Sequence, residues 1–127
     1  MTLFAIYGTF MRGQPGHGNL AGARFLADVR TEPRYRLWLV DSLWPALVPD
    51  EDGVEIACEL YDVPDDLLAE LARIEPPGWN RAPVELVGGR VAEAFLGVPE
   101  LRRRGVDVSE CASWSAFVAS AQPAART

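Results

Sequence analysis

One carboxylate in the 127-residue sequence lies where a helix should present its apolar face. On a helix over residues 65–75, at about 100° per residue, Glu75 falls close to Leu71 inside the apolar stripe. Burial and the negative end of the helix dipole both disfavour a charged carboxylate there. Both effects raise the pKa of Glu75 toward the range of a general acid or base at neutral pH. The alternative is that the helix frays at Pro76, and Glu75 turns into water to pair with Arg81.

A glycine-rich loop follows the first apolar run of the chain. Residues 3–7 predict a buried strand, and residues 8–18 contain Gly8, Gly13, Gly16 and Gly18. Successive backbone N–H groups in such a turn can hold an anion, for example a carboxylate. The loop lacks the signature of a P-loop, and no helix pattern opens directly after it, as a dinucleotide-binding turn requires. A plain structural turn is the alternative interpretation.

The composition excludes several kinds of chemistry. The net charge is −6, so we expect no nucleic-acid partner, which would need a basic face. All the basic residues counted as Lys+Arg are arginines, which removes Schiff-base chemistry. A single histidine, His17, excludes a multi-histidine metal site; we expect it in an exposed loop, where it could line a pocket mouth. Cys58 and Cys111 lack metal-ligand spacing and predict small buried side chains. We expect neither metal nor cofactor.

Length and hydropathy predict a single domain over residues 1–127, with 122–127 as a frayed tail. No apolar run approaches the roughly 18 residues of a membrane span, and the N-terminus lacks the shape of a signal peptide. We therefore expect a cytoplasmic protein with no membrane association. It should be a monomer or a homodimer.

The periodicity predicts a mixed α+β chain. A helix should begin at Pro64 and end at Ile74 or Glu75, before Pro76-Pro77-Gly78. A second helix is expected over 110–121, capped by Ser109. The prolines and Asp52-Gly53 within 44–53 predict a loop. Further strands are expected at 24–31, 35–40, 54–62, 83–88 and 91–98, the last two joined across Gly88-Gly89.

The loop and the carboxylate together resemble a known family. The stretch Tyr7-Gly8-Thr9-Phe10-Met11-Arg12-Gly13 is similar to the YGSLxxG loop of the gamma-glutamylcyclotransferase-like (AIG2-like) superfamily. Residues 59–63 and 67–71, followed by Ile74-Glu75, resemble its "GxVYxV … LLxxLDxxE" segment, and Arg81 resembles the arginine that follows. The chain departs from the pattern at Cys58, Ala72 and Asn80. The resemblance implies an α+β fold, a small mixed β-barrel of about five to seven strands with flanking helices and one pocket.

The resemblance also implies a reaction. Backbone N–H groups of Tyr7, Gly8, Thr9 and Phe10 would hold the carboxylate end of a γ-glutamyl group. Glu75 would be the general base, and Arg81 its charge partner. The α-amine then attacks the γ-amide of the same molecule, which closes the ring of 5-oxoproline and releases an amine without a metal or a cofactor. The substrate partner would be a small γ-glutamyl amide. By analogy with the family, the step could remove a γ-glutamyl protecting group in natural-product biosynthesis.

A second resemblance concerns the framework. Residues 76–78, 84–86 and 89–90, and the tail 106–109 with Trp114, are similar to the C-terminal domain of allophanate hydrolases. That domain belongs to the same superfamily but acts on small nitrogen-carboxyl compounds. The alternative function is therefore hydrolysis, decarboxylation or rearrangement of another small carboxylated amide. A second alternative is a non-catalytic small-molecule binding module, for which Glu75→Gln keeps full biological activity.

Overall fold

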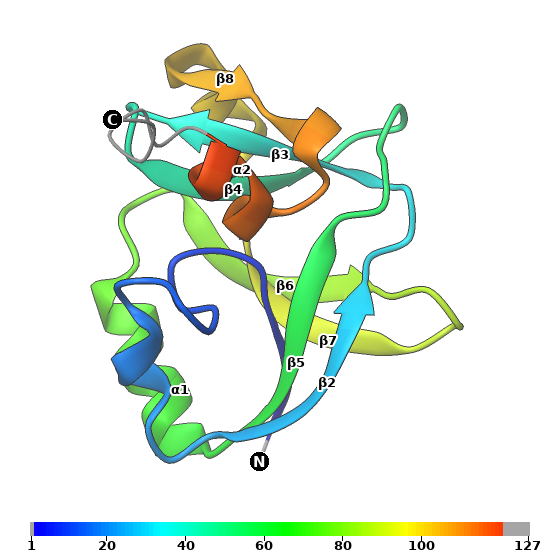
Figure 1. The fold of residues 1–127 in the computed structure, drawn as a ribbon. Coiled ribbons are helices and arrows are strands. Elements are labelled where there is room, and N and C mark those ends of the chain that lie inside the picture. The colour runs from blue at the N-terminus through cyan, green and yellow to red at the C-terminus, as the bar shows by residue number, and fades with distance from the viewer. Residues whose placement is uncertain (1, 121–127) are drawn as a thin grey trace.

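The computed structural model describes residues 2–120 (Figure 1), so the expected tail at 122–127 lies outside the described residues. The described chain has two α-helices, α1 (Asp65–Ile74) and α2 (Trp114–Ser120), and short 3₁₀ turns at His17–Leu20, Pro99–Arg104 and Ser109–Cys111. Its strands are β1 (Thr2–Ile6), β2 (Arg24–Arg30), β3 (Tyr35–Val40), β4 (Trp44–Pro49), β5 (Ala57–Val63), β6 (Trp79–Glu85), β7 (Val91–Gly97) and β8 (Gly105–Asp107). None of the described helices is long and apolar enough to span a membrane.

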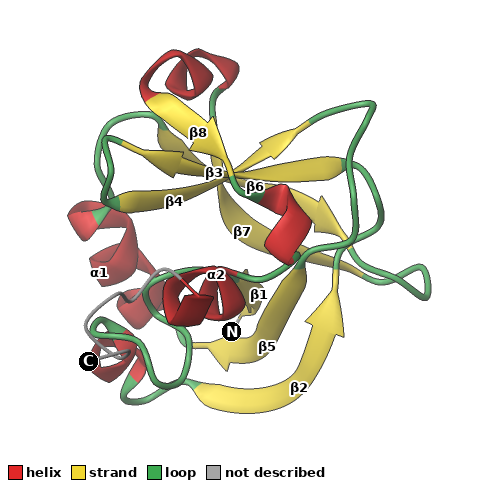
Figure 2. Ribbon diagram, turned by 45° about the horizontal axis from the view of Figure 1, so that its top comes forward, coloured by secondary structure: helices red, strands yellow, loops and turns green. Residues whose placement is uncertain are grey.

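The strands form one mixed, curled sheet. Its order is β2-β5-β1-β7-β4-β3-β8, and β6 pairs with β7 beside this path. An isolated bridge between Thr31 and Leu86 links the end of β2 to the end of β6, so β2, β5, β1, β7 and β6 curl toward a barrel. Figure 2 shows β1, β5 and β2 of this group below the group formed by β3, β4 and β8, with α1 to one side between them. The expected α+β fold, a small barrel-like sheet with flanking helices, is confirmed.

Strand β7 is the fork of this sheet. One of its edges pairs with β6 over its whole length. The other edge is shared, because β1 pairs with it in parallel at Phe4–Glu93 and β4 pairs with it in parallel at Leu47–Leu96. Two strands that pair with successive parts of one edge must separate from each other on one side. The opening between the end of β1 and the start of β4 is where the cavity described below lies.

Helix α1 covers the core with Leu68 and Leu71, which are fully or almost fully buried, as its periodicity predicts. The helix ends at Ile74, whose side chain is 53% exposed rather than part of the buried stripe. Glu75 has already left the helix, with extended backbone angles φ −72° and ψ 136°. Its position after the helix, and not its angle around the helix axis, determines where the carboxylate points.

Two expectations about the elements are wrong. Residues 44–49 form strand β4 instead of a loop, since Pro45 and Pro49 lie near its two ends and β4 pairs with β7 at Leu47 alone. The C-terminal helix is also interrupted, because Ala112 adopts the left-handed conformation (φ 56°) between a 3₁₀ turn and α2. Ser109 does not cap that helix. Its hydroxyl accepts a hydrogen bond from the N–H of Leu37 at 2.7 Å and ties the segment to β3.

Candidate active site

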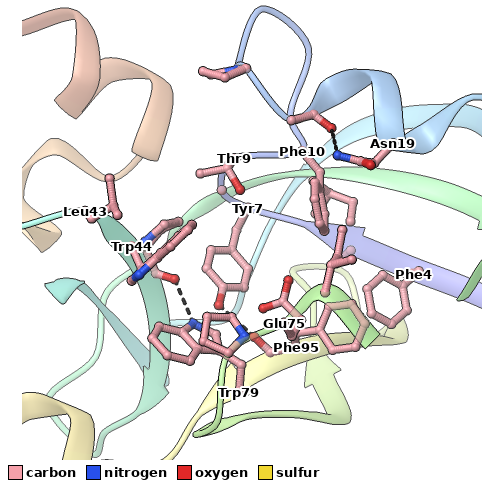
Figure 3. Close-up of a pocket in the computed structure, with 18 residues that line it drawn as sticks. Phe4, Tyr7, Thr9, Phe10, Asn19, Leu43, Trp44, Glu75, Trp79 and Phe95 are labelled. Carbon is pink, nitrogen blue, oxygen red and sulfur yellow. Dashed lines mark hydrogen bonds between the residues drawn. The ribbon is translucent and has the colours of Figure 1, made fainter. Parts of the chain in front are cut away.

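A cavity of about 440 Å³ opens at the fork of the sheet, a volume typical of small-molecule sites (Figure 3). Its walls come from the end of β1 and the loop after it, the start of β4, the end of α1, and β6 and β7. Most of the lining is apolar or aromatic. The lining residues are Phe4, Ala5, Ile6, Tyr7, Gly8, Thr9, Phe10, Pro15, Gly16, Asn19, Leu43, Trp44, Pro45, Ile74, Glu75, Pro76, Trp79 and Phe95.

Glu75 is the acidic side chain of this lining. In Figure 3 its carboxylate points from the end of α1 into the space between Tyr7 and Phe10. Loss of water around it raises the pKa of Glu75 to about 7, against a usual value of 4.5. Within residues 2–120 the carboxylate has no hydrogen-bond or ion-pair partner. A carboxyl group in this state exchanges a proton readily at neutral pH.

Arg81 is not a neighbour of Glu75 in the cavity. It lies on β6 with an exposed side chain, and its Nε donates to Glu93 on the paired strand β7. Neither residue of this ion pair lines the cavity. On the same strand Trp79 and Val84 are buried, whereas Arg81 is exposed.

The loop that follows β1 supplies the other wall of the site. The N–H groups of Gly8, Thr9 and Phe10 donate no backbone hydrogen bond to the described residues, so they remain available to a ligand. The loop comes very close to β4: a Cβ placed on Gly8 would lie 2.5 Å from Cγ of Pro45. Only glycine permits this approach. The glycine at this position is therefore explained by packing of the loop against β4.

Tyr7 has a structural contact that the sequence did not reveal. Its hydroxyl donates to the backbone oxygen of Phe95 at 2.6 Å, across the fork from β1 to β7. Burial raises the pKa of Tyr7 well above its usual range, so the phenol stays protonated and keeps this hydrogen bond. On the facing side, Nε1 of Trp79 donates to the backbone oxygen of Pro45 at 2.8 Å. These two hydrogen bonds tie the end of β1 to β7 and the start of β6 to β4, around the cavity.

An ion pair between a buried carboxylate and a half-exposed arginine anchors the loop. Glu59 on β5 is 5% exposed, and it accepts hydrogen bonds from the backbone N–H and the Nε of Arg12, both at 3.0 Å. The hydroxyl of Tyr61 donates to the same carboxylate at 2.9 Å. The Arg12 guanidinium also pairs with Asp28. Sequence reasoning gave Glu59 no role; the signal it left was a charged residue within the apolar strand 57–63.

His17 supports the loop but does not line the main cavity. Its Nδ1 lies 2.9 Å from the backbone oxygen of Phe10. The ring borders a second hollow of about 280 Å³, together with Arg12 and Tyr61. The structure therefore brings Glu75 and the loop over residues 7–10 together at one cavity, and leaves His17 and Arg81 outside its lining.

The comparisons with known proteins agree with this architecture. The family model for the allophanate hydrolase C-terminal domain matches residues 2–119. The chain belongs to this family. A urea amidolyase of Saccharomyces cerevisiae is 28% identical over 100 residues, which is 72% of this chain and 5% of the yeast protein. The chain thus corresponds to a small part of that much larger relative.

Solved structures show the same fold. A protein specific to uropathogenic E. coli is 29% identical, with a TM-score of 0.87 over 93% of this chain and 95% of that chain. An AIG2-like protein from Mus musculus is 24% identical, with a TM-score of 0.63 over 80% of this chain and 82% of that chain. The family match confirms the framework resemblance to the allophanate hydrolase C-terminal domain, and the likeness to the AIG2-like protein shows that the two chains share a fold.

Proposed function

We propose that this protein is a γ-glutamylamine cyclotransferase, in which Glu75 is the catalytic base. The proposal rests on Glu75, whose pKa is about 7 and which has no partner among the described residues. Across an apolar cavity it faces the loop after β1, in which the N–H groups of Gly8, Thr9 and Phe10 have no backbone acceptor among the described residues. A carboxylate of this kind suits proton transfer, and the N–H groups suit a substrate carboxylate. Membership of a family that includes enzymes is consistent with catalysis.

The proposed reaction needs one proton-transfer group. Glu75 as carboxylate takes a proton from the α-ammonium group of the γ-glutamyl donor. The freed amine attacks the γ-carbonyl carbon of the same molecule and forms the new C–N bond. Protonated Glu75 then returns the proton to the departing nitrogen as the original amide bond breaks. The attacking nitrogen, which still carries two protons, then loses one of them to Glu75, and Glu75 passes it to the released amine. The products are 5-oxoproline and an alkylammonium ion, and Glu75 is again ionised.

The rest of the rate enhancement comes from the way in which the cavity positions the donor. Ring closure is intramolecular, so holding the donor in a bent conformation removes much of the entropic barrier. The N–H groups of Gly8, Thr9 and Phe10 would bind its α-carboxylate, while apolar walls exclude water that would otherwise compete. Such a step, carried out in the cytoplasm, would suit removal of a γ-glutamyl protecting group in natural-product biosynthesis.

Family membership favours a second candidate. The allophanate hydrolase C-terminal domain match covers residues 2–119, whereas the likeness to the AIG2-like protein shows the fold alone. The same base and anion-binding loop would serve decarboxylation, hydrolysis or rearrangement of a small N-carboxylated amide. This candidate predicts release of carbon dioxide or ammonia, and no 5-oxoproline.

Mass spectrometry of the products tests the proposal. Purified protein is incubated with several γ-glutamyl amines and γ-glutamyl dipeptides, and 5-oxoproline is quantified for wild type, Glu75→Gln and Glu70→Gln. Glu70 is the matched control, because it is an exposed carboxylate on α1 paired with Arg73. We expect release by wild type and Glu70→Gln, and a loss of at least about 100-fold in Glu75→Gln. No release from any donor would overturn the proposal.

A further inference from the structure

Three large apolar side chains are exposed at the mouth of the cavity. Leu43 is 58% exposed, Trp44 37% and Ile74 53%, and all three belong to its lining. They come from the β3–β4 turn, the start of β4 and the end of α1. Figure 3 shows Leu43 and Trp44 on the same side of the cavity, beyond Tyr7 as seen from Glu75. We call these three residues the apolar rim.

The turn that presents Leu43 is held in an unfavourable backbone conformation. Asp41 and Ser42 both adopt left-handed angles, with φ 54° and 58°, which cost free energy in residues other than glycine. The Asp41 carboxylate pairs with both Nε and Nη2 of Arg104, at 3.0 and 2.7 Å. The N–H of Leu43 bonds to the oxygen of Val40 at 3.0 Å. The exposed leucine is therefore placed by a specific turn and is not a chance feature of a loose loop.

The cavity offers no cation to a second carboxylate. Across residues 2–120, neither arginine nor histidine contributes to its lining. The arginines next to its walls are occupied, since Arg12 pairs with Glu59, Arg73 with Glu70 and Arg104 with Asp41. A carboxylate near the apolar rim would lose water without gaining a partner, and would also be repelled by Glu75.

From these observations we infer that the leaving amine is apolar, aromatic or aliphatic, carries no carboxylate, and packs against the apolar rim. This inference rests on the proposed cyclotransferase function and names the variable half of its substrate. The γ-glutamyl part lies between Glu75 and the loop after β1, and the amide substituent points outward over Leu43, Trp44 and Ile74. Burial of an aromatic ring on such a surface favours binding in proportion to the apolar area covered.

A matched set of donors tests the inference. γ-Glutamyl phenethylamide and γ-glutamylphenylalanine differ by one carboxylate, and γ-glutamyl methylamide lacks the apolar substituent. We expect kcat/KM for the phenethylamide to exceed that for the methylamide by about tenfold or more, and that for the dipeptide by about 100-fold. Equal or greater kcat/KM for the dipeptide would overturn the inference and leave the cyclotransferase proposal in place.

Variants of the apolar rim test which residues cause the preference for the phenethylamide. Leu43→Ser and Ile74→Ser should bring the phenethylamide-to-methylamide ratio close to one, while Val106→Ser, an exposed apolar residue on β8 outside the lining, should leave it unchanged. An unchanged ratio in both rim variants would contradict the inference. So would a Leu43→Ser protein that keeps the ratio but changes from dimer to monomer in sedimentation, because the rim would then be a contact between copies.

A binding measurement separates the two proposals. N-Phenethylacetamide carries the apolar amide substituent without a glutamyl group, and its affinity can be followed by calorimetry. We expect binding to wild type that is at least about fivefold weaker in Leu43→Ser. If no donor releases 5-oxoproline but this difference is found, the cyclotransferase proposal fails and the apolar ligand site stands. If the amide binds neither protein, the apolar site fails whatever the turnover.

Discussion

A carboxylate that faces aromatic side chains must either find a partner or hold its proton more tightly. Among the described residues Glu75 has no partner, and desolvation raises its pKa to about 7. The periodicity of residues 65–75 led us to expect Glu75 on the apolar face of the helix, with a raised pKa, or turned into water where the helix frays. Glu75 is not on the buried face of α1; it lies one residue beyond the helix end, where Pro76 and the extended backbone direct it into the cavity.

The raised pKa predicts the pH dependence of catalysis. The base must be ionised in the free protein, so log kcat/KM should rise with pH and level off above about 7. Steady-state kinetics from pH 5 to 9 with one donor measures this profile. A profile already flat at pH 5.5 would show that Glu75 is ionised well below neutrality and would contradict its assignment.

The same carboxylate should cost stability at neutral pH. Between pH 4.5 and about 7 the folded protein keeps a proton on Glu75 that the unfolded chain releases, so stability falls as pH rises through this window. The difference between the two pKa values corresponds to about 3 kcal/mol at most. Glu75→Gln should therefore match wild type at pH 4 and exceed it by up to about 3 kcal/mol at pH 8. Urea unfolding at both values measures the difference, and equal stability at pH 8 would contradict the desolvated state.

Glu59 should affect both the stability of the fold and the binding of substrate. Glu59→Gln keeps the shape of the side chain but removes the charge that accepts from Arg12 and Tyr61. We expect a loss of about 2–3 kcal/mol in unfolding free energy and a raised KM, because the loop over residues 8–12 loses its anchor. Arg30→Gln, which removes an exposed ion pair with Glu55, is the control and should change neither. Unaltered stability in Glu59→Gln would show that the loop is held by other contacts.

The elements that build the cavity are a strand end, a strand start and a helix end. Their positions follow from the fork at β7, where β1 and β4 share one edge. The sequence indicated β1, the loop and α1, because each has a clear apolar run with a glycine or proline boundary. It did not indicate β4, since Pro45 and Pro49 are unfavourable in a central strand. They are tolerated because β4 pairs fully with β3 and touches β7 at one position.

Local sequence patterns do not reveal side-chain contacts that depend on how distant strands pair. The resemblance placed Arg81 beside Glu75, but the register of β6 against β7 sets it opposite Phe95, where its exposed side chain pairs with Glu93. The ion pair between Arg12 and Glu59 spans 47 residues, so no sequence window contains it. Contacts of this kind depend on how distant strands align.

The close approach of the loop to β4 can be tested by a substitution at Gly8. Gly8→Ala places a methyl group about 2.5 Å from the Pro45 ring, which cannot turn away, so the loop must shift. We expect a loss of about 1–3 kcal/mol in unfolding free energy and at least tenfold in kcat/KM. Gly18→Ala is the matched control, because the space around Gly18 is open. Equal behaviour of the two variants would show that the loop does not depend on this contact.

At the scale of the whole molecule, the curled sheet alone does not determine the function. The chain belongs to the allophanate hydrolase C-terminal domain family, and its fold is shared with an AIG2-like protein. Two residues of the framework resemblance make packing contacts. Gly78 lies against the side chain of Leu101 in a 3₁₀ turn, and the hydroxyl of Ser109 accepts a hydrogen bond from the N–H of Leu37 on β3. The function therefore depends on the cavity, where Glu75 and the loop after β1 meet.

Titration of the Glu75 side chain in the folded protein tests the central claim most directly. Carbon-13 NMR of protein labelled at the glutamate carboxyl carbons resolves these groups, and the signal lost in Glu75→Gln assigns Glu75. We predict a midpoint near 7 for this signal, well above the value of about 4.3 that is usual for a glutamate side chain. A midpoint near 4.5 for Glu75 would show an ordinary, hydrated carboxylate and would contradict its role as the proton-transfer group of this cavity.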